Sequence, residues 1–282
     1  MISVLQLGVI DYATGLRLQE RLVALRKDGQ IGDVLLLLEH APVITLGRNA
    51  KRENVIASHE ILAERGVEIF ECDRGGDVTF HGPRQLVGYP IFDLRGFPSS
   101  ETHRHHLGVV EYVRKLEEVL IRTCGDFGIP TQRIQGLTGV WTQGPSTSLG
   151  MTKEDLGMAK EKLGMTMKSN EAKIAALGVH ISRGVTSHGF ALNINTDLSY
   201  FDLIIPCGIA SKPVTSMAKE SGRDVPMQDV VHAVARNFGT AFGSQILWLE
   251  TLDALLGQTV GVPLQVPREL RQLHKEEDTS WA

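Results

Sequence analysis

A cysteine between a proline and a glycine is the first residue of this sequence whose setting suggests chemistry. Cys207 lies in the string FDLIIPCGIASKPVTSM, residues 201–217, directly after a short apolar run. A thiol on a Pro-Cys-Gly turn can be accessible, and accessible thiols of low pKa are nucleophiles. The alternative, a purely structural cysteine, stays open at this point. Cys72 and Cys124 lie nearly inside apolar runs, and the spacing of the three cysteines suggests neither a disulfide framework nor a CxxC metal site.

A lysine at the start of an apolar run is the second candidate. Lys173 opens the string KIAALGVHISRGVTSHGFALNINTDL, residues 173–198, which reads as strands. A lysine at the start of a strand is usually a solvated edge residue. Partial burial would instead lower the pKa of its amine and make it a usable base near neutral pH. A functional Lys173 therefore requires partial burial.

The same string contains a histidine in a predicted turn. Residues 187–189, Ser-His-Gly, are expected to turn the chain into a half-buried strand whose apolar positions alternate: Phe190, Leu192 and Ile194. His188 taken alone is more often structural than catalytic. Asn193 and Asn195 share one face of that strand and are expected to make hydrogen bonds there.

A pair of adjacent glycines marks a third cluster, RGGDVTFHGPRQLVGYP, residues 74–90. Glycines remove side chains where the backbone turns or approaches a ligand closely. Gly75 and Gly76 lie between two strand candidates, which predicts a hairpin-like connection. Arg74 and His81 bracket the segment, and the alternative is a tight turn with these two as solvated polar residues.

The elements that must position these residues form a mixed pattern. Strands are expected at residues 3–8, 33–40, 42–48, 67–73 and 85–94, and helices at 11–28, 58–66, 105–123 and 226–243. Ser58 is the expected N-cap of its helix and Gly66 the expected C-cap. Several neighbouring strands have no helix between them. The sequence therefore predicts a mixed α/β (α+β) fold rather than a regular βαβ array.

One segment interrupts this pattern. Residues 143–171 repeat Leu-Gly-Met at 149–151, 156–158 and 163–165. A coiled coil is a poor interpretation, because glycine is unfavourable inside helices. A low-complexity insertion in a surface loop is the better one. The polar stretch from about residue 262 is expected to be a loosely held tail.

The overall composition narrows the class of protein. The 282 residues carry a formal net charge of −4 and a pI near 6.2, which argues against a nucleic-acid binder. No apolar run is long enough to cross a bilayer, and the start lacks a signal-peptide pattern. We therefore expect a cytoplasmic protein with neither nucleic-acid nor membrane partners.

Four strings taken together resemble the lipoyl/octanoyl transferase family: RGGDVTFHGP, GVW, KIAALGVHISRGVTSHGFALN and INTDL…IIPCGI. The resemblance covers residues 1–243 without the insertion at about 143–171, which implies one catalytic domain and a C-terminal extension at 244–282. It implies the fold of biotin and lipoate protein ligases, a mixed sheet flanked by helices. Unlike the family, which usually connects GVW to the lysine by a short loop, this chain has its insertion just before Lys173.

The resemblance also assigns roles to residues. It implies that Cys207 is the nucleophile and Lys173 its catalytic partner. The substrate-cradling residues that it implies are Arg74, Gly75, Gly76, Asp77, Val78, Thr79, Phe80 and His81, with Ala176, Leu177 and Gly178, and with Gly189, Phe190 and Ala191. No metal and no cofactor are implied.

The implied reaction moves an octanoyl group between two carrier proteins. The donor would be octanoyl-acyl carrier protein. The acceptor would be a lysine on the lipoyl domain of a 2-oxoacid dehydrogenase complex or on the glycine cleavage H protein. Cys207 would hold the acyl group as a thioester between the two steps.

Three other functions remain open. An ATP-dependent lipoate or biotin ligase would need no nucleophilic cysteine. A catalytically silent carrier-binding protein would keep its function in Cys207→Ala. A Cys-His hydrolase using His188 or His81 would release free octanoate.

Overall fold

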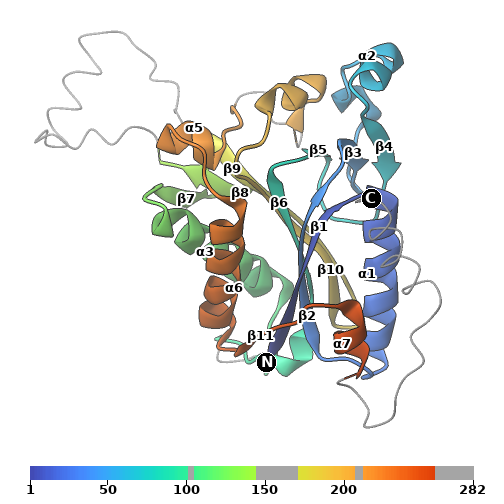
Figure 1. The fold of residues 1–282 in the computed structure, drawn as a ribbon, viewed down its shortest axis with the longest axis vertical. Coiled ribbons are helices and arrows are strands. Elements are labelled where there is room, and N and C mark those ends of the chain that lie inside the picture. The colour runs from blue at the N-terminus through green and yellow to red at the C-terminus, as the bar shows by residue number, and fades with distance from the viewer. Residues whose placement is uncertain (101–104, 144–170, 207–211, 258–282) are drawn as a thin grey trace, which may run out of the picture.

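The structure, a computed structural model, describes residues 1–100, 105–143, 171–206 and 212–257 (Figure 1). Its strands are β1 Ile2–Ile10, β2 Asp33–His40, β3 Val43–Leu46, β4 Glu68–Glu71, β5 Val78–His81, β6 Gln85–Ile91, β7 Thr131–Ile134, β8 Leu137–Thr142, β9 Lys173–Ser182, β10 Val185–Asn193 and β11 Ile246–Trp248. Its α-helices are α1 Tyr12–Lys27, α2 His59–Glu64, α3 Val109–Asp126, α5 Met217–Ser221, α6 Met227–Phe242 and α7 Leu252–Gly257. Short 3₁₀ helices are η1 Arg52–Asn54, η2 Leu94–Gly96 and η3 Leu198–Leu203.

A mixed sheet forms the centre of the molecule. Within the described ranges its strand order is β11-β1-β2-β6-β10-β9-β8-β7. β1 runs parallel to both β11 and β2, whereas the pairs from β2 through to β7 are antiparallel. A smaller sheet of order β4-β3-β5 lies beside it. The predicted mixed α/β class is therefore confirmed.

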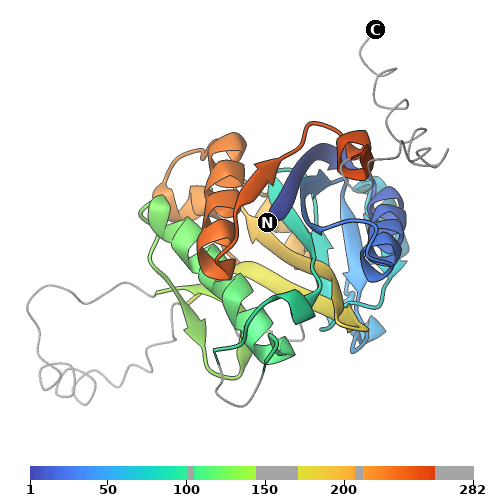
Figure 2. The ribbon, with the colours of Figure 1, turned by 90° about the horizontal axis from the view of Figure 1, so that it is seen from below.

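The apolar run of β2 explains how the sheet is covered on both faces. Leu35 and Leu37 pack into a core with α3 and α6, whereas Leu36 and Leu38 pack into a second core with α1. Successive side chains of a strand point to opposite faces, so a run that is apolar throughout needs cover on both sides. Figure 2 shows α3 and α6 side by side on one face and α1 on the other.

Helix caps follow the local sequence. Ser58 caps α2 as expected, since its hydroxyl accepts a hydrogen bond from the N–H of Ile61. The C-cap is Arg65 rather than Gly66, and Gly66 follows it with a φ of +62°. Glycine belongs at this position after the cap because the left-handed conformation carries no Cβ penalty there.

Three predictions about the chain between β4 and β10 were wrong: a hairpin at Gly75 and Gly76, a turn at residues 187–189, and a half-buried strand after that turn. Because β3 lies between β4 and β5, the connection through Gly75 and Gly76 is a crossover rather than a hairpin, and β5 is an additional strand before β6. The turn before β10 lies at Arg183 and Gly184, both with positive φ, so His188 is inside the strand. The strand is buried on both faces, since Ala191 is as inaccessible as Phe190.

Part of the expected C-terminal extension, residues 244–282, also belongs to this fold. Strand β11 pairs with β1, and Leu255 of α7 packs in the core that faces α1. These residues belong to the segment 244–282, so the division of the chain at residue 243 stays a prediction. Most of the insertion predicted at 143–171 and the expected tail lie outside the described residues. In the part of the chain that the structure describes, no helix is long and apolar enough to cross a membrane.

Candidate active site

A narrow pocket lies on the side of the sheet that faces α1, where the start of α1, the β4–β5 connection and strands β5, β6, β9 and β10 meet. We name it the acyl pocket. Its lining residues are Tyr12, Arg74, Gly76, Thr79, His81, Val87, Tyr89, Ala176, Leu177, Gly178, His188, Gly189, Phe190 and Ala191. All three segments that the resemblance implied therefore contribute to one pocket, although they are far apart along the chain.

Four residues of the implied set lie outside this lining. Val78 and Phe80 pack in the core of the small sheet. Asp77 accepts hydrogen bonds from the backbone N–H of Lys51 and Val78 and from the Asn54 side chain. The N–H of Gly75 donates to the carbonyl of Val179. These contacts shape the segment, and a role of the four in substrate binding stays a prediction.

Arg74 is buried rather than solvated. Its Nε and Nη2 donate to the hydroxyl of Thr45, Nη2 also donates to the carbonyl of Thr45, and Nη1 donates to the carbonyl of Gly75. The guanidinium thus ties the glycine segment to β3. It also brings a positive charge to the wall of the acyl pocket.

His81 is buried too, and it belongs to a hydrogen-bond chain. Its Nδ1 lies 2.9 Å from Oε1 of Gln85, and Nε2 of Gln85 donates to Oδ1 of Asn193 at 2.8 Å. Asn193 in turn donates to the carbonyl of Thr215, and Asn195 bonds to the backbone of Val225. The hydrogen bonds expected of both asparagines are confirmed.

A second, smaller cavity adjoins the acyl pocket and contains Lys173. It shares Thr79, Ala176 and Ala191 with the acyl pocket, and its other lining residues are Gln85, Lys173, Asn193, Phe201, Pro206 and Val214. Lys173 is only 7% exposed, and its Nζ lies 4.8 Å from the centroid of the Trp141 ring. The partial burial that the chemistry requires is present, and the solvated-edge alternative is wrong.

The chain on both sides of Cys207 is fixed close to Lys173. Before it, Pro206 lines the lysine cavity, and the N–H of Ile205 donates to the carbonyl of Asn54 at 2.7 Å. After it, the carbonyl of Pro213 accepts a hydrogen bond from the N–H of Lys173 at 2.8 Å. Cys207 itself lies outside the described residues.

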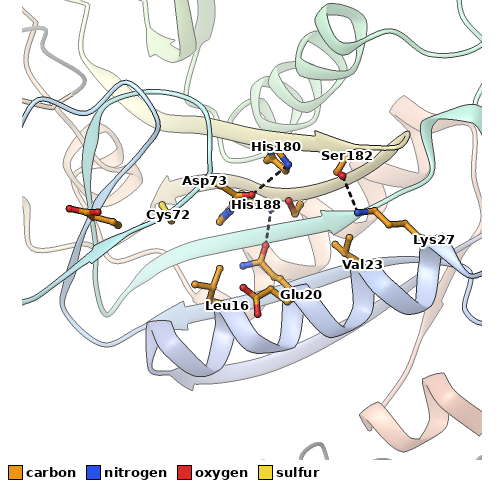
Figure 3. A pocket seen from close by; sticks show the side chains of 12 residues that line it. Leu16, Glu20, Val23, Lys27, Cys72, Asp73, His180, Ser182 and His188 are labelled. Atoms are coloured by element: carbon orange, nitrogen blue, oxygen red, sulfur yellow. Dashed lines mark hydrogen bonds and ion pairs between the residues drawn. The ribbon is translucent and has the colours of Figure 1, made fainter.

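The far end of the acyl pocket is polar. Nε2 of His188 lies 2.7 Å from Oδ1 of Asp73, and Nε2 of His180 lies 3.5 Å from Oδ2 of the same carboxylate (Figure 3). Burial lowers the pKa of His188 against the opposing effect of its hydrogen bond to Asp73. Cys72 lines the groove beyond this cluster, whereas Cys124 is fully buried.

Sequence reasoning missed several residues of this site. Asp73 directly precedes the Arg-Gly-Gly string, and that adjacency was the available signal. Trp141 ends the GVW string, but nothing local placed it beside Lys173, and Tyr12 carried no signal, because only folding brings strand β8 and the start of α1 to this site.

Two buried histidines predict a loss of stability in acid. Burial lowers the pKa of His40 to about 4; burial, with the charge of His40 as a smaller cause, lowers that of His81 to about 3. Both bind a proton in the unfolded chain below about pH 6.5. Stability is therefore complete above pH 6.5 and falls as the pH drops toward 4, by about 1.4 kcal/mol per pH unit for each histidine.

Urea unfolding between pH 7.5 and 4.5 measures this slope. In His40→Gln, where an amide can replace the contacts to the carbonyl of Ile10 and the hydroxyl of Tyr89, the slope should fall by about one proton. The exposed His59 serves as control, and His59→Gln should keep the wild-type slope. Equal slopes in all three proteins would contradict the expectation.

Comparison with known proteins places the chain in a family. The model of the lipoyl protein ligase A/B catalytic domain matches residues 11–239. The octanoyltransferase of Koribacter versatilis is 56% identical over 277 residues, which are 98% of each chain. The octanoyltransferase of Acidobacterium capsulatum is 56% identical over 258 residues, 91% of this chain and 96% of that protein. The chain belongs to the lipoyl protein ligase A/B catalytic domain family and, within it, to the octanoyltransferases.

Solved structures confirm the fold. A crystal structure of lipoate-protein ligase A bound with ATP superposes with a TM-score of 0.61 at 14% identity, covering 97% of this chain and 92% of that one. The bipartite lipoate protein ligase of Thermoplasma acidophilum gives 0.61 at 15% identity, covering 97% and 90%. The expected ligase-like fold, a mixed sheet flanked by helices, is therefore confirmed.

Proposed function

We propose that this enzyme moves an octanoyl group from octanoyl-acyl carrier protein to a lysine of a lipoyl domain through a thioester on Cys207. The observation that carries the proposal is the cavity shared by Lys173 and Pro206, which continues into the acyl pocket. Consecutive Cα atoms are about 3.8 Å apart. Cys207 directly follows Pro206, so its Cα lies about that far from a residue that lines the cavity of the buried Lys173 side chain.

The first step exchanges one thioester for another. The Lys173 amine takes the Cys207 proton, and the thiolate attacks the donor carbonyl. The carbon–sulfur bond to the donor then breaks, and the departing thiolate takes the proton back from Lys173. Because the bond formed and the bond broken are alike, the step needs no ATP.

The second step forms the amide. The ε-amine of the acceptor lysine attacks the acyl-enzyme carbonyl, and the bond to the Cys207 sulfur breaks. Lys173 receives the proton that the amine loses and passes it to the Cys207 thiolate. The greater stability of an amide drives this step forward.

The acyl pocket suits a fatty tail rather than a polar substrate at its centre. Between the lysine cavity and the polar far end, its walls include Val87, Ala176 and Ala191. A seven-carbon tail buried there contributes roughly 5 kcal/mol at about 0.8 kcal/mol per methylene. Acceptors would be lipoyl domains of 2-oxoacid dehydrogenase complexes and the glycine cleavage H protein.

The proposal is tested by intact-protein mass measurement. Mixing with octanoyl-acyl carrier protein in the absence of ATP should add one octanoyl group to the enzyme. Adding an apo lipoyl domain should remove that group and transfer it to the domain. Cys207→Ala, with an unchanged melting temperature, should show neither change.

Each rival function gives a different result in this experiment. A ligase would form product only with ATP and free octanoate. A hydrolase would release octanoate as the main product. A silent binding protein would show no mass gain, and in that case the proposal fails.

A glycine beside the pocket provides a further prediction. A Cβ at Gly178 would lie 2.6 Å from the carbonyl oxygen of Gly75 and 3.3 Å from Cδ of Arg74. Gly178→Ala should therefore push the glycine segment away from β9. Since a displacement of about 1 Å can cost on the order of a hundredfold in rate, we expect kcat/KM for octanoyl transfer to fall about 10- to 100-fold.

Steady-state kinetics with a matched variant checks this expectation. An added Cβ at the exposed Gly32 meets no atom within 4 Å, so Gly32→Ala should keep the wild-type kcat/KM. Wild-type kinetics in a folded Gly178→Ala variant would show that the glycine segment has no influence on the substrate.

A further inference from the structure

The side chain of His188 separates two cavities. It lines the end of the acyl pocket, and it also lines a groove of about 550 Å³ between α1 and the β9–β10 hairpin (Figure 3). Among the described residues, no other lines both. His188 is therefore a wall that the pocket and the groove share, and together with its hydrogen-bond partner Asp73 we call it the end wall.

The end wall is held in place at an energetic cost. His188 has a φ of +55°, a left-handed conformation that non-glycine residues adopt rarely and at a cost of about 1–3 kcal/mol. Its N–H donates to Oε1 of Gln19 at 2.7 Å, and its Nε2–H donates to Asp73 at 2.7 Å. Its ring also meets the Tyr89 ring edge-on. A strained residue fixed by its neighbours on three sides is a reason to look for a function.

The wall lies opposite the reacting end of the pocket. The Ala176–Ala191 pair lines both the acyl pocket and the lysine cavity, and the Val179–His188 pair follows three residues further along the two strands. At about 3.3 Å per residue, the two pairs are roughly 10 Å apart. That span is comparable with an extended eight-carbon chain that enters from the side of Lys173.

We infer that the end wall, His188 held by Asp73, sets the upper limit on acyl chain length in this enzyme. The inference rests on the proposed octanoyl transfer and names the residues that contact the tail end. Without the imidazole, the pocket opens into a groove that has Leu16 and Val23 in its lining. Longer acyl chains then gain apolar contacts where they previously met a buried, hydrogen-bonded ring.

The test measures kcat/KM for carrier-bound acyl groups of six to fourteen carbons with the full chain and a lipoyl domain as acceptor. His188→Gly is the chosen variant, because glycine adopts a positive φ without strain. Each methylene is worth about a fourfold change, so the decanoyl-to-octanoyl ratio should rise about tenfold or more. His180→Ala is the matched control: His180 approaches the same carboxylate but does not line the acyl pocket, so the ratio should stay unchanged.

A second variant covers the case in which His188→Gly does not fold. Asp73→Ala leaves the strand intact and frees the imidazole, so the ratio should rise several-fold. A folded His188→Gly or Asp73→Ala with the wild-type ratio would overturn the inference while leaving octanoyl transfer itself standing. Failure of the wild-type enzyme to transfer octanoyl would overturn the proposed function and this inference together.

Discussion

Replacing Lys173 with methionine is expected to slow both acyl-transfer steps by about 10²- to 10⁴-fold, the range typical of a lost general base. Methionine keeps much of the apolar volume of the lysine stem but cannot carry a proton between Cys207 and either carrier. Lys173 is buried against the Trp141 ring. The melting temperature of Lys173→Met, measured beside that of wild type, shows that the variant is folded when its rates are compared.

Single-turnover kinetics separates the two steps. The rate at which octanoyl-acyl carrier protein adds mass to the enzyme reports the first step, and the rate at which isolated acyl-enzyme loses it to a lipoyl domain reports the second. If only one of the two rates falls, Lys173 does not serve as base in both.

A neighbouring lysine supplies the control for this experiment. Nζ of Lys212 lies 5.6 Å from the centroid of the same Trp141 ring and 2.6 Å from a carboxylate oxygen of Glu171. Lys212→Met therefore removes a second lysine amine near the same ring without emptying the lysine cavity. Its rates should stay within a few-fold of wild type, and losses of equal size in both variants would indicate a general electrostatic effect.

A methyl group at Gly189 is expected to cost about 3 kcal/mol of folding free energy, the upper part of the usual range for overpacking. The added Cβ would lie 2.2 Å from the carbonyl oxygen of Gly88 and 2.6 Å from Cδ of Pro90. Both belong to β6, which pairs with β10 in the middle of the large sheet. A central backbone strand cannot move aside as a flexible side chain can.

Thermal and urea unfolding of Gly189→Ala measure this effect. The midpoint should fall by roughly 6–12 °C for a chain of this size, and the urea midpoint should fall in parallel. Gly125→Ala in α3 is the matched change, because its Cβ meets no atom within 4 Å. Alanine is favoured over glycine in helices by about 0.5–1 kcal/mol, so Gly125→Ala should be as stable as wild type or slightly more so.

Local sequence patterns predicted most elements of the fold. The apolar run at 33–40 became β2, and the helical spacing at 11–28 became α1, because both patterns reflect which faces must be buried. Predictions failed where pairing between distant segments decides the outcome. Nothing local shows that β3 inserts between β4 and β5, or that a histidine with positive φ lies inside β10.

The features of the candidate site also fall into those that the sequence determined and those that only the folded structure shows. By itself the sequence determined the residue types and their order: a Pro-Cys-Gly thiol, a lysine at the start of a strand, and three glycine-containing segments. Only the tertiary structure decided that Lys173 is buried beside Trp141, that Pro206 faces the same cavity, and that Asp73 holds His188 at the end of the acyl pocket. Side-chain type is encoded one residue at a time, whereas burial and distance arise when strands from distant parts of the chain pair and exclude water between them.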